Sequence, residues 1–248
     1  MARTARLAAP ALLLLAASLV LLWFIILSGI TRTSPLRQTY FLRADTSGIP
    51  GARSISQWTY FRVCGAGNLD CGPSRPALPL GDAWASGAGG VPAPLIGRYG
   101  NGTTSFHYWY MWRFGWVFFL LALLFEVLAF GAGLLALCSR LGSVLAGLIA
   151  LAGLVFLTVA VSLMTATFVG MRNVFADAGR AASLGRYAFG FAWGSWAALL
   201  ISAILFFLAR HKREPAIAAT STGRTRRSWW PWRRSATRRS SRVKGDYA

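Results

Sequence analysis

"FGWVFFLLALLFEVLAFGAGLLAL", residues 114–137, is an apolar run in which Glu126 carries the only charge. A helix needs about 20 such residues to cross a hydrocarbon core roughly 30 Å thick. The run does not alternate between polar and apolar residues, as the strands of a membrane barrel do. Because helices and closed barrels are the structures that satisfy their backbone in lipid, we expect a transmembrane helix here.

Three further runs, residues 7–30, 144–169 and 187–209, are of similar length and contain no charged residue. The composition agrees, because 55% of the 248 residues are hydrophobic and 13% are charged, against about 25% charged in soluble domains. We therefore predict an all-α membrane protein built on a four-helix transmembrane bundle. The first run exceeds the about 7–15 apolar residues of a signal peptide, which favours an anchor over a cleaved leader.

Basic residues close to the membrane predict the orientation of the chain. They flank the first and last runs at Arg3, Arg6, Arg210, Lys212 and Arg213. We therefore expect residues 1–6, 138–143 and 210–248 in the cytoplasm, and residues 31–113 and 170–186 outside the cell. The three arginines of the 170–186 loop argue against this orientation, but the two ends of the chain outweigh them.

Two of the three cysteines, Cys64 and Cys71, lie in the outer segment, where an oxidising compartment favours a disulfide. Its short loop would contribute roughly 2.5 kcal/mol by restricting the unfolded chain. A metal site would need further Cys or His, and His107 is the only histidine in this segment. The stretches "LRQTYFL" (36–42) and "SISQWTYFRV" (54–63) are typical of short strands. We expect a small extracellular module with a disulfide and β-structure.

The remainder of the outer segment holds two further features. Residues 65–102 are rich in Pro, Gly and Ala, which predicts a loop without regular structure. Asn101 begins an Asn-Gly-Thr acceptor sequence for N-glycosylation. The stretch "HYWYMWRFGW" (107–116) then enters the membrane as an interfacial aromatic belt, with Arg113 at headgroup depth. A carbohydrate-binding aromatic platform is the alternative.

Three stretches together carry a resemblance to a known family. They are "QWTYFRVCGAGNLDCGPSRPALPLG" (57–81), "RFGWVFFLLALLFEVLAFGAGLLALCSRLG" (113–142) and "LMTATFVGMRNVFADAGRAASLGRYAFGFAWGSWAALL" (163–200). In this order, over about residues 10–210, the chain resembles the fungal Sur-seven/PalI family of four-span plasma-membrane proteins. The matching motif positions are Trp58, Cys64, Cys71, Arg113, Gly185, Gly190 and Trp193.

This resemblance implies a fungal protein of static cortical patches called eisosomes, linked to membrane organisation, endocytosis and cell-wall integrity. The PalI branch is associated instead with ambient-pH signalling. The Trp and two Cys are also similar to the pattern in claudins. The claudin G-L-W element is absent, however, and Tyr60-Phe61-Arg62 stands in its place. Sealing between cells is therefore not carried over to this chain.

Glu126 lies near the middle of its run, where a charge costs at least ~2.5 kcal/mol. Thr158, Ser162 and Thr165 share one face of the third helix by their spacing. A hydrogen bond from Glu126 to this stripe would join two helices at about 1 kcal/mol. Two alternative roles for Glu126 are part of an ion or proton path, and an uncharged acid that faces lipid.

Small residues recur in two of the runs. The fourth contains Gly190, Gly194 and Ala198 at intervals of four, and the second contains Gly131 and Gly133. Such residues let helix backbones approach closely. They would close the bundle internally, or else hold copies of the chain together as a homo-oligomer.

The predicted cytoplasmic face carries candidate modification sites and a basic tail. Cys138 is either a passive thiol or a candidate for S-palmitoylation. The tail, residues 210–248, holds 12 Lys and Arg against 2 acids and few aliphatic residues, which predicts disorder. Its lipid-binding candidates are Arg226, Arg227, Trp229, Trp230, Trp232, Arg233 and Arg234, and its candidate phosphorylation sites are Ser228, Ser235 and Ser240.

Tryptophan and arginine together favour the membrane interface, so we expect the tail to bind anionic inner-leaflet lipids or phosphoinositides, not nucleic acid. The sequence offers no nucleophile–base pair, phosphate loop or metal cluster, and we expect neither catalysis nor a cofactor. The leading hypothesis is a structural protein that organises a plasma-membrane domain with other cortical patch proteins. A pH-sensor or wall-stress-sensor subunit is the main alternative. A channel or transporter is disfavoured because no internal repeat is found.

Overall fold

The computed structural model describes residues 2–31, 33–136 and 139–211. Its long helices are α1 (Ala2–Ile26), α3 (Phe106–Ala136), α4 (Arg140–Asp177) and α5 (Arg186–His211). Each contains a segment long and apolar enough to cross a membrane, namely Leu7–Ile26, Phe106–Leu135, Leu141–Asp177 and Arg186–Ala209. The predicted four-helix transmembrane bundle is confirmed.

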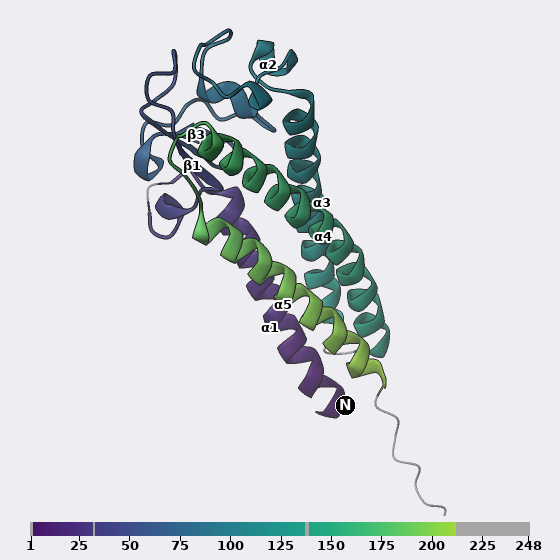
Figure 1. Cartoon of the computed structure of the whole chain (residues 1–248). Helices are drawn as coiled ribbons and strands as arrows, with labels where there is room; N and C mark the ends of the chain where they lie inside the picture. The colour runs from purple at the N-terminus through teal and green to yellow at the C-terminus, as the bar shows by residue number, and fades with distance from the viewer. Residues whose placement is uncertain (1, 32, 137–138, 212–248) are drawn as a thin grey trace, which may run out of the picture. The chain divides into compact units, whose positions relative to one another are not determined.

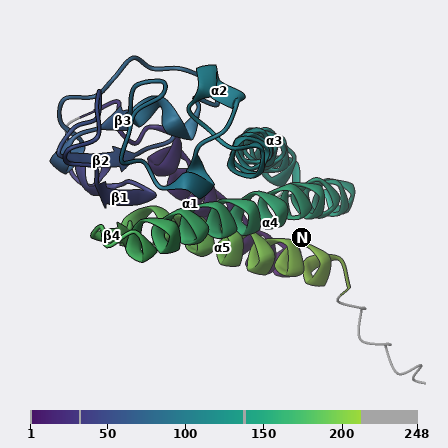
Figure 2. The ribbon, with the colours of Figure 1, turned by 45° about the horizontal axis from the view of Figure 1, so that its top comes forward.

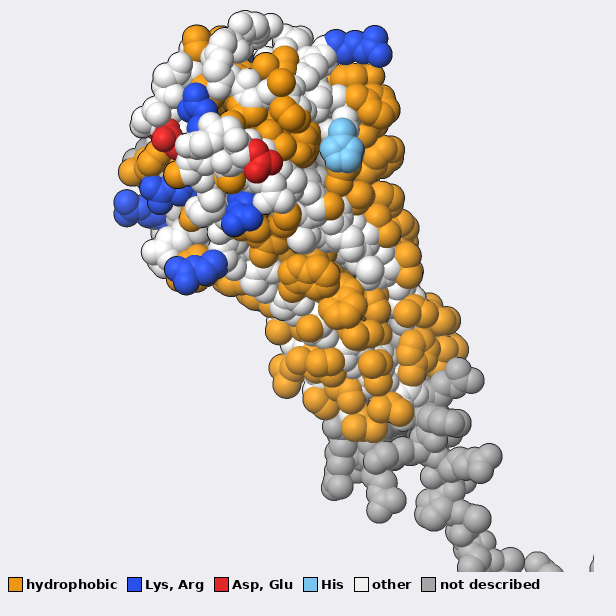
Figure 3. All heavy atoms as spheres, in the orientation of Figure 1, with side chains coloured by type: hydrophobic (Ala, Val, Ile, Leu, Met, Phe, Trp, Pro, Cys, Tyr) orange, Lys and Arg blue, Asp and Glu red, His pale blue; other side chains and the backbone are white. Residues whose placement is uncertain are grey.

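The helices pack in pairs. α3 lies along α4, α1 lies along α5, and α4 also contacts α5 (Figure 1). Buried side chains at these contacts include Leu15, Leu22, Phe119, Leu157 and Phe206. On the face that Figure 3 shows, the side chains of the helical part are largely hydrophobic, as expected of helices whose outer faces meet lipid.

Serine hydroxyls connect the helices inside the bundle. The hydroxyls of Ser18 on α1 and Ser195 on α5 lie 2.8 Å apart, and Ser202 of α5 donates to the carbonyl of Ala11, 2.7 Å away. Bonds of this kind stabilise helix pairs in lipid by roughly 1 kcal/mol each. These contacts lock α1 against α5 at two levels.

A small antiparallel sheet lies at one end of the bundle. Its strands are β1 (Leu42–Asp45), β2 (Ile55–Trp58), β3 (Val63–Cys64) and β4 (Ala182–Leu184), in the order β3-β2-β1-β4. Arg43 on β1 is opposite both Gln57 and Ser183. Figure 2 shows the strands beside the helices, with the loops of residues 65–105 lying over them. We call residues 36–105 together with β4 the module.

The strand predictions need two corrections. Residues 36–38 form a 3-10 turn, η1 (Leu36–Gln38). Thr39 stabilises this turn by donating its hydroxyl to the carbonyl of Pro35, 3.0 Å away. Only Leu42 of the predicted strand 36–42 therefore belongs to β1. The stretch 54–63 is two strands, since Thr59 bonds back to Arg62 at 2.9 Å and turns the chain between them.

The segment 65–102 is mainly irregular, as expected. It contains short turns at η2 (Ala66–Asn68), η3 (Leu80–Ala83) and η4 (Ala93–Leu95), and a four-residue helical turn α2 (Tyr99–Gly102). Side chains from this segment are buried, among them Leu78, Leu80, Trp84 and Leu95. Burial of these groups orders a loop that lacks regular hydrogen bonding.

α4 continues beyond the predicted apolar run, through residues 170–177. Met171 and Phe175 lie on one face of this extension and are fully buried. The extension is helical because the module covers the face that carries these two residues. The chain then turns at Gly179, whose φ is 74°, and continues into β4.

The N-terminus and the end of α5 lie at the end of the bundle away from the module (Figure 1). Four crossings of a membrane therefore leave these two ends on the same side. The assignment of that side to the cytoplasm stays a prediction.

Candidate functional site

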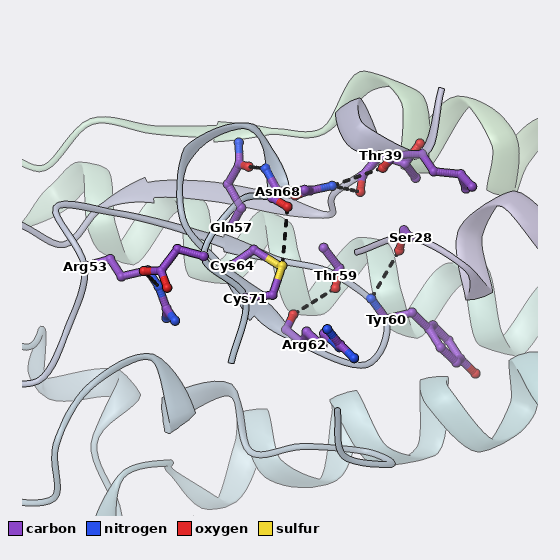
Figure 4. Close-up of a disulfide and its surroundings, with 12 residues drawn as sticks. Ser28, Thr39, Arg53, Gln57, Thr59, Tyr60, Arg62, Cys64, Asn68 and Cys71 are labelled. Carbon is purple, nitrogen blue, oxygen red and sulfur yellow. Dashed lines mark hydrogen bonds and ion pairs between the residues drawn. A yellow bond between two sulfur atoms is a disulfide. The ribbon is translucent and has the colours of Figure 1, made fainter. Parts of the chain in front are cut away.

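The candidate functional site is the module and its junction with the helices. The predicted disulfide is formed between Cys64 on β3 and Cys71 (Figure 4). Between them the chain folds back, with Gly65 donating its backbone N–H to Leu69 at 2.7 Å. Asn68 and Asp70 take up positive φ angles of 53° and 49°, a conformation that Asn and Asp tolerate better than most residues.

Asn68 is the residue that attaches the disulfide loop to the sheet. It is buried, and its backbone N–H donates to the Gln57 side-chain oxygen at 2.8 Å. Its side-chain amide donates to the carbonyls of Leu36 at 3.1 Å and Thr39 at 2.8 Å (Figure 4). The sequence places Asn68 only within the loop predicted for residues 65–102, because nothing in a single chain distinguishes a loop Asn from one that bridges three segments.

Trp58 is a core residue of the module. Its indole N–H donates to the carbonyl of Leu80 at 2.8 Å. Its ring centroid lies 6.4 Å from that of Trp84 and 6.0 Å from that of Phe175 on α4. The motif tryptophan thus joins β2, the irregular loop and the helix extension.

An aromatic cluster fixes the sheet to the helices. Phe41 stacks on Phe168 of α4 at 5.0 Å between centroids, and Trp112 of α3 meets Phe168 edge-on at 5.4 Å. Tyr60 stacks on Trp116 and donates its hydroxyl to the Trp116 carbonyl at 2.7 Å. Burial raises the pKa of Tyr60, so the phenol stays a neutral donor. The 107–116 stretch is therefore helical, and part of it faces the module instead of lipid.

The motif glycines have different environments. Gly185 donates its N–H to the Phe41 carbonyl at 3.0 Å, and a side chain there would collide with the backbone carbonyl of Tyr40. Gly190 has open space where a side chain would stand, and Trp193 is 44% exposed. Gly185 therefore belongs to the junction, while Gly190 and Trp193 lie on the outer face of α5.

The small residues predicted to pack helices together also differ in their surroundings. Gly133 packs inside the bundle, because an added Cβ there would lie 2.7 Å from the side chain of Leu12. Gly194 is near Leu21, at 3.4 Å, whereas Gly131 has open space. The sequence did not single out Gly153. An added Cβ there would lie 3.2 Å from the Cβ of Phe125, so the missing side chain lets α4 pack closely against α3.

The predicted hydrogen bond from Glu126 to the third helix is not formed. Thr158 donates to the Leu154 carbonyl at 2.7 Å and accepts from Trp196 at 2.8 Å, Thr165 donates to the Val161 carbonyl at 2.7 Å, and Ser162 is exposed. The Thr158 and Thr165 hydroxyls therefore bond to groups on α4 or α5, and none of the three hydroxyls bonds to Glu126.

Glu126 is 0% exposed, so an acid facing lipid is also excluded. Within the described residues its carboxyl oxygens have no hydrogen-bond partner. The hydroxyl of Ser18 on α1 lies beside them but is engaged with Ser195.

Some of the arginine side chains outside the bundle core are held by partners in the module or on their own helix. Arg180 follows α4 and donates to the carbonyls of Ser47 at 2.9 Å and Gly90 at 3.2 Å. The Ser47 side chain and backbone hold the pKa of Asp45, in the same turn, below its usual value by hydrogen bonding. Arg180, which argued against the expected orientation, is thus a structural arginine. Arg113 lies 3.8 Å from the centre of the Trp109 ring, a favourable cation–π geometry.

Asn101 lies in the α2 turn with an exposed side chain. Thr103, the third residue of the acceptor sequence, is buried and donates its hydroxyl to the Gly100 carbonyl at 2.6 Å. Glycosylation stays a prediction.

Cys138 and the tail residues at 226–240 lie outside the described residues. In the part that is described, no cluster of His, Cys, Asp or Glu has the makings of a metal site.

Comparisons with known proteins identify a family model and several relatives that resemble this chain. A model of the SUR7/PalI family matches residues 7–205. "Protein SUR7" of Candida albicans is 36% identical over 200 residues, which cover 79% of this chain and 71% of that protein. "SUR7 family protein FMP45" of Saccharomyces cerevisiae is 35% identical, covering 81% of this chain and 65% of that protein. An "Uncharacterized plasma membrane protein", YNL194C of the same yeast, is 27% identical over 84% of this chain and 70% of its own length.

Proposed function

This chain belongs to the SUR7/PalI family, and we propose that it is a non-enzymatic protein that organises patches of the fungal plasma membrane. The family match spans both the module and the bundle, from residue 7 to residue 205, and this coverage carries the proposal. A relative bears the words plasma membrane in its name. The patches would be eisosome-like and would support endocytosis and cell-wall integrity.

The junction between module and bundle supports an organising role. Phe41, Trp58 and Tyr60 of the module are packed against aromatic residues of α3 and α4, and Gly185 lets α5 begin directly beside β1. A module held in this way has a fixed position at the membrane surface. A fixed surface suits lateral contacts with lipids, with copies of the chain or with other cortical proteins.

Two further parts of the proposal concern the ends of the chain. Both termini lie in the cytoplasm, and the basic tail contacts anionic inner-leaflet lipids or phosphoinositides. The support is the charge of the tail, with 12 Lys and Arg against 2 acids in residues 210–248, since each basic residue near such a leaflet contributes about 1 kcal/mol.

Live-cell imaging of a fluorescently tagged copy tests the proposal. Stable puncta at the cell cortex are the expected result. An even rim around the cell, with loss of ambient-pH or wall-stress signalling on deletion, would contradict patch organisation. That outcome would favour a PalI-like sensor subunit, which the shared family model also accommodates.

A further inference from the structure

Three arginines line one pocket at the base of the sheet. Arg37 lies in the η1 turn, Arg43 is on β1, and Arg186 is the first residue of α5. The pocket has a volume of about 260 Å³, and Tyr40 and Tyr187 are among its other lining residues. All three arginine side chains belong to exposed residues, so their guanidinium groups are accessible from outside.

No acid in the pocket neutralises these charges. Its lining contains neither Asp nor Glu. The ion pairs among the described residues are formed elsewhere, by Arg53 with Asp70 and by Arg75 with Asp82. Like charges gathered in one pocket repel each other, and an anion bound between them relieves that repulsion.

The position of the pocket indicates where the anion comes from. Arg186 begins both α5 and its apolar, membrane-crossing segment, so the pocket lies where the helix enters the membrane. Tyr187 is 47% exposed at the same level, and tyrosine is enriched at membrane interfaces. Figure 3 shows arginine side chains spread over the end of the molecule that carries the module, whereas the helical part is hydrophobic. The positive end of the α5 dipole adds to the field there.

We propose that this pocket binds the phosphate of an anionic lipid headgroup in the leaflet on the module's side of the membrane. Guanidinium groups match phosphate oxygens with paired hydrogen bonds. A second pocket, of about 560 Å³, shares Arg43 with the first and is lined by Asp45, Ser47, Ser54 and Ser183 among others. It offers hydroxyl partners to a polyol attached to the phosphate.

Photo-crosslinking tests the proposal. The full chain is reconstituted in nanodiscs with a phosphatidylinositol that carries a diazirine close to its headgroup, and the labelled peptides are identified by mass spectrometry. The expected labels lie on peptides that contain residues 36–43 and 184–190. Arg43→Gln and Arg186→Gln each reduce this labelling by about tenfold, as loss of a charged hydrogen-bonding partner does. Labels on the tail stay unchanged, which separates this site from any inner-leaflet binding.

Arg98→Gln is the matched control, because Arg98 is exposed on the module, lies over Tyr99 and does not line the pocket. A diacylglycerol with the same diazirine reports labelling that needs no phosphate. Equal labelling of these peptides in wild type and both pocket variants would overturn the proposal, as would an equal loss in Arg98→Gln. Inorganic phosphate at millimolar concentration is added as a competitor, and full displacement would assign the pocket to free phosphate instead of lipid. An unchanged melting temperature and an intact disulfide show that each variant is folded.

Discussion

Gly185 lies at a point where the chain has no room for a side chain. The Tyr40 carbonyl occupies the space that a Cβ would need, and the Gly185 N–H bonds to Phe41. A hydrogen atom in place of a side chain is what permits β1 and the start of α5 to meet. The requirement here is close approach rather than an unusual backbone angle.

Gly185→Ala is expected to destabilise the protein. Forcing a methyl group into a packed contact costs about 1–3 kcal/mol, which corresponds to about 2–4 °C in melting temperature per kcal/mol for a chain of this size. Gly190→Ala, on the first turns of α5, is the matched control, because its Cβ would meet open space. Thermal unfolding in detergent measures both. Equal melting temperatures for the two variants would show that the Tyr40 contact yields without cost.

Glu126→Leu is expected to raise the melting temperature. The carboxyl group is buried without a hydrogen-bond partner among the described residues, and a buried polar group left unsatisfied costs about 1–3 kcal/mol. Glu126→Gln keeps the shape of the side chain and should fall between wild type and Leu. A lower melting temperature for Leu than for Gln would mean that the acid has a partner in the membrane, such as a bound water or ion.

At the scale of elements, the extension of α4 joins membrane and module. Residues 170–177 bury Met171 and Phe175 beneath the sheet and loop, and Phe175 meets Trp58 and Trp84. The helix is therefore longer than a membrane requires because its last turns belong to the core of the module.

Phe175→Ala should loosen the module without removing the helices from the membrane. Truncating a buried phenylalanine costs about 3–5 kcal/mol. Limited proteolysis of the 65–102 loop should become faster, while Asn173→Ala, at an exposed position on the same extension, should leave it unchanged. Equal cleavage rates for the two variants would show that the loop is held by other contacts.

The elements that the sequence predicts well are those with a strong local signal. Apolar length predicts the four helices, and the redox environment predicts the Cys64–Cys71 bridge. β4 was missed because three residues carry no pattern of their own and are extended only by pairing with β1. The partners of Asn68 and the surroundings of Glu126 depend on segments far apart in the chain, and spacing along one helix cannot reveal them.

At the scale of the whole molecule, the tail adds charge to a chain whose described part is an apolar bundle with a packed module. A peptide of residues 210–248 is expected to bind vesicles that contain anionic lipid. Asp at Ser228, Ser235 and Ser240 should weaken binding by roughly 3 kcal/mol, at about 1 kcal/mol per charge. Vesicle sedimentation measures this. Binding that ignores both the lipid charge and the substitutions would rule out electrostatic attachment of the tail.

The central claim is that a module fixed to the bundle holds the protein in stable membrane patches. Fluorescence recovery after photobleaching of tagged wild type, Gly185→Ala and Gly190→Ala in living cells tests it most directly. Wild type and Gly190→Ala should form cortical puncta that recover slowly, whereas Gly185→Ala that reaches the membrane should be diffuse and recover quickly. Slow recovery in puncta for all three, with Gly185→Ala shown to be destabilised in detergent, would contradict the claim.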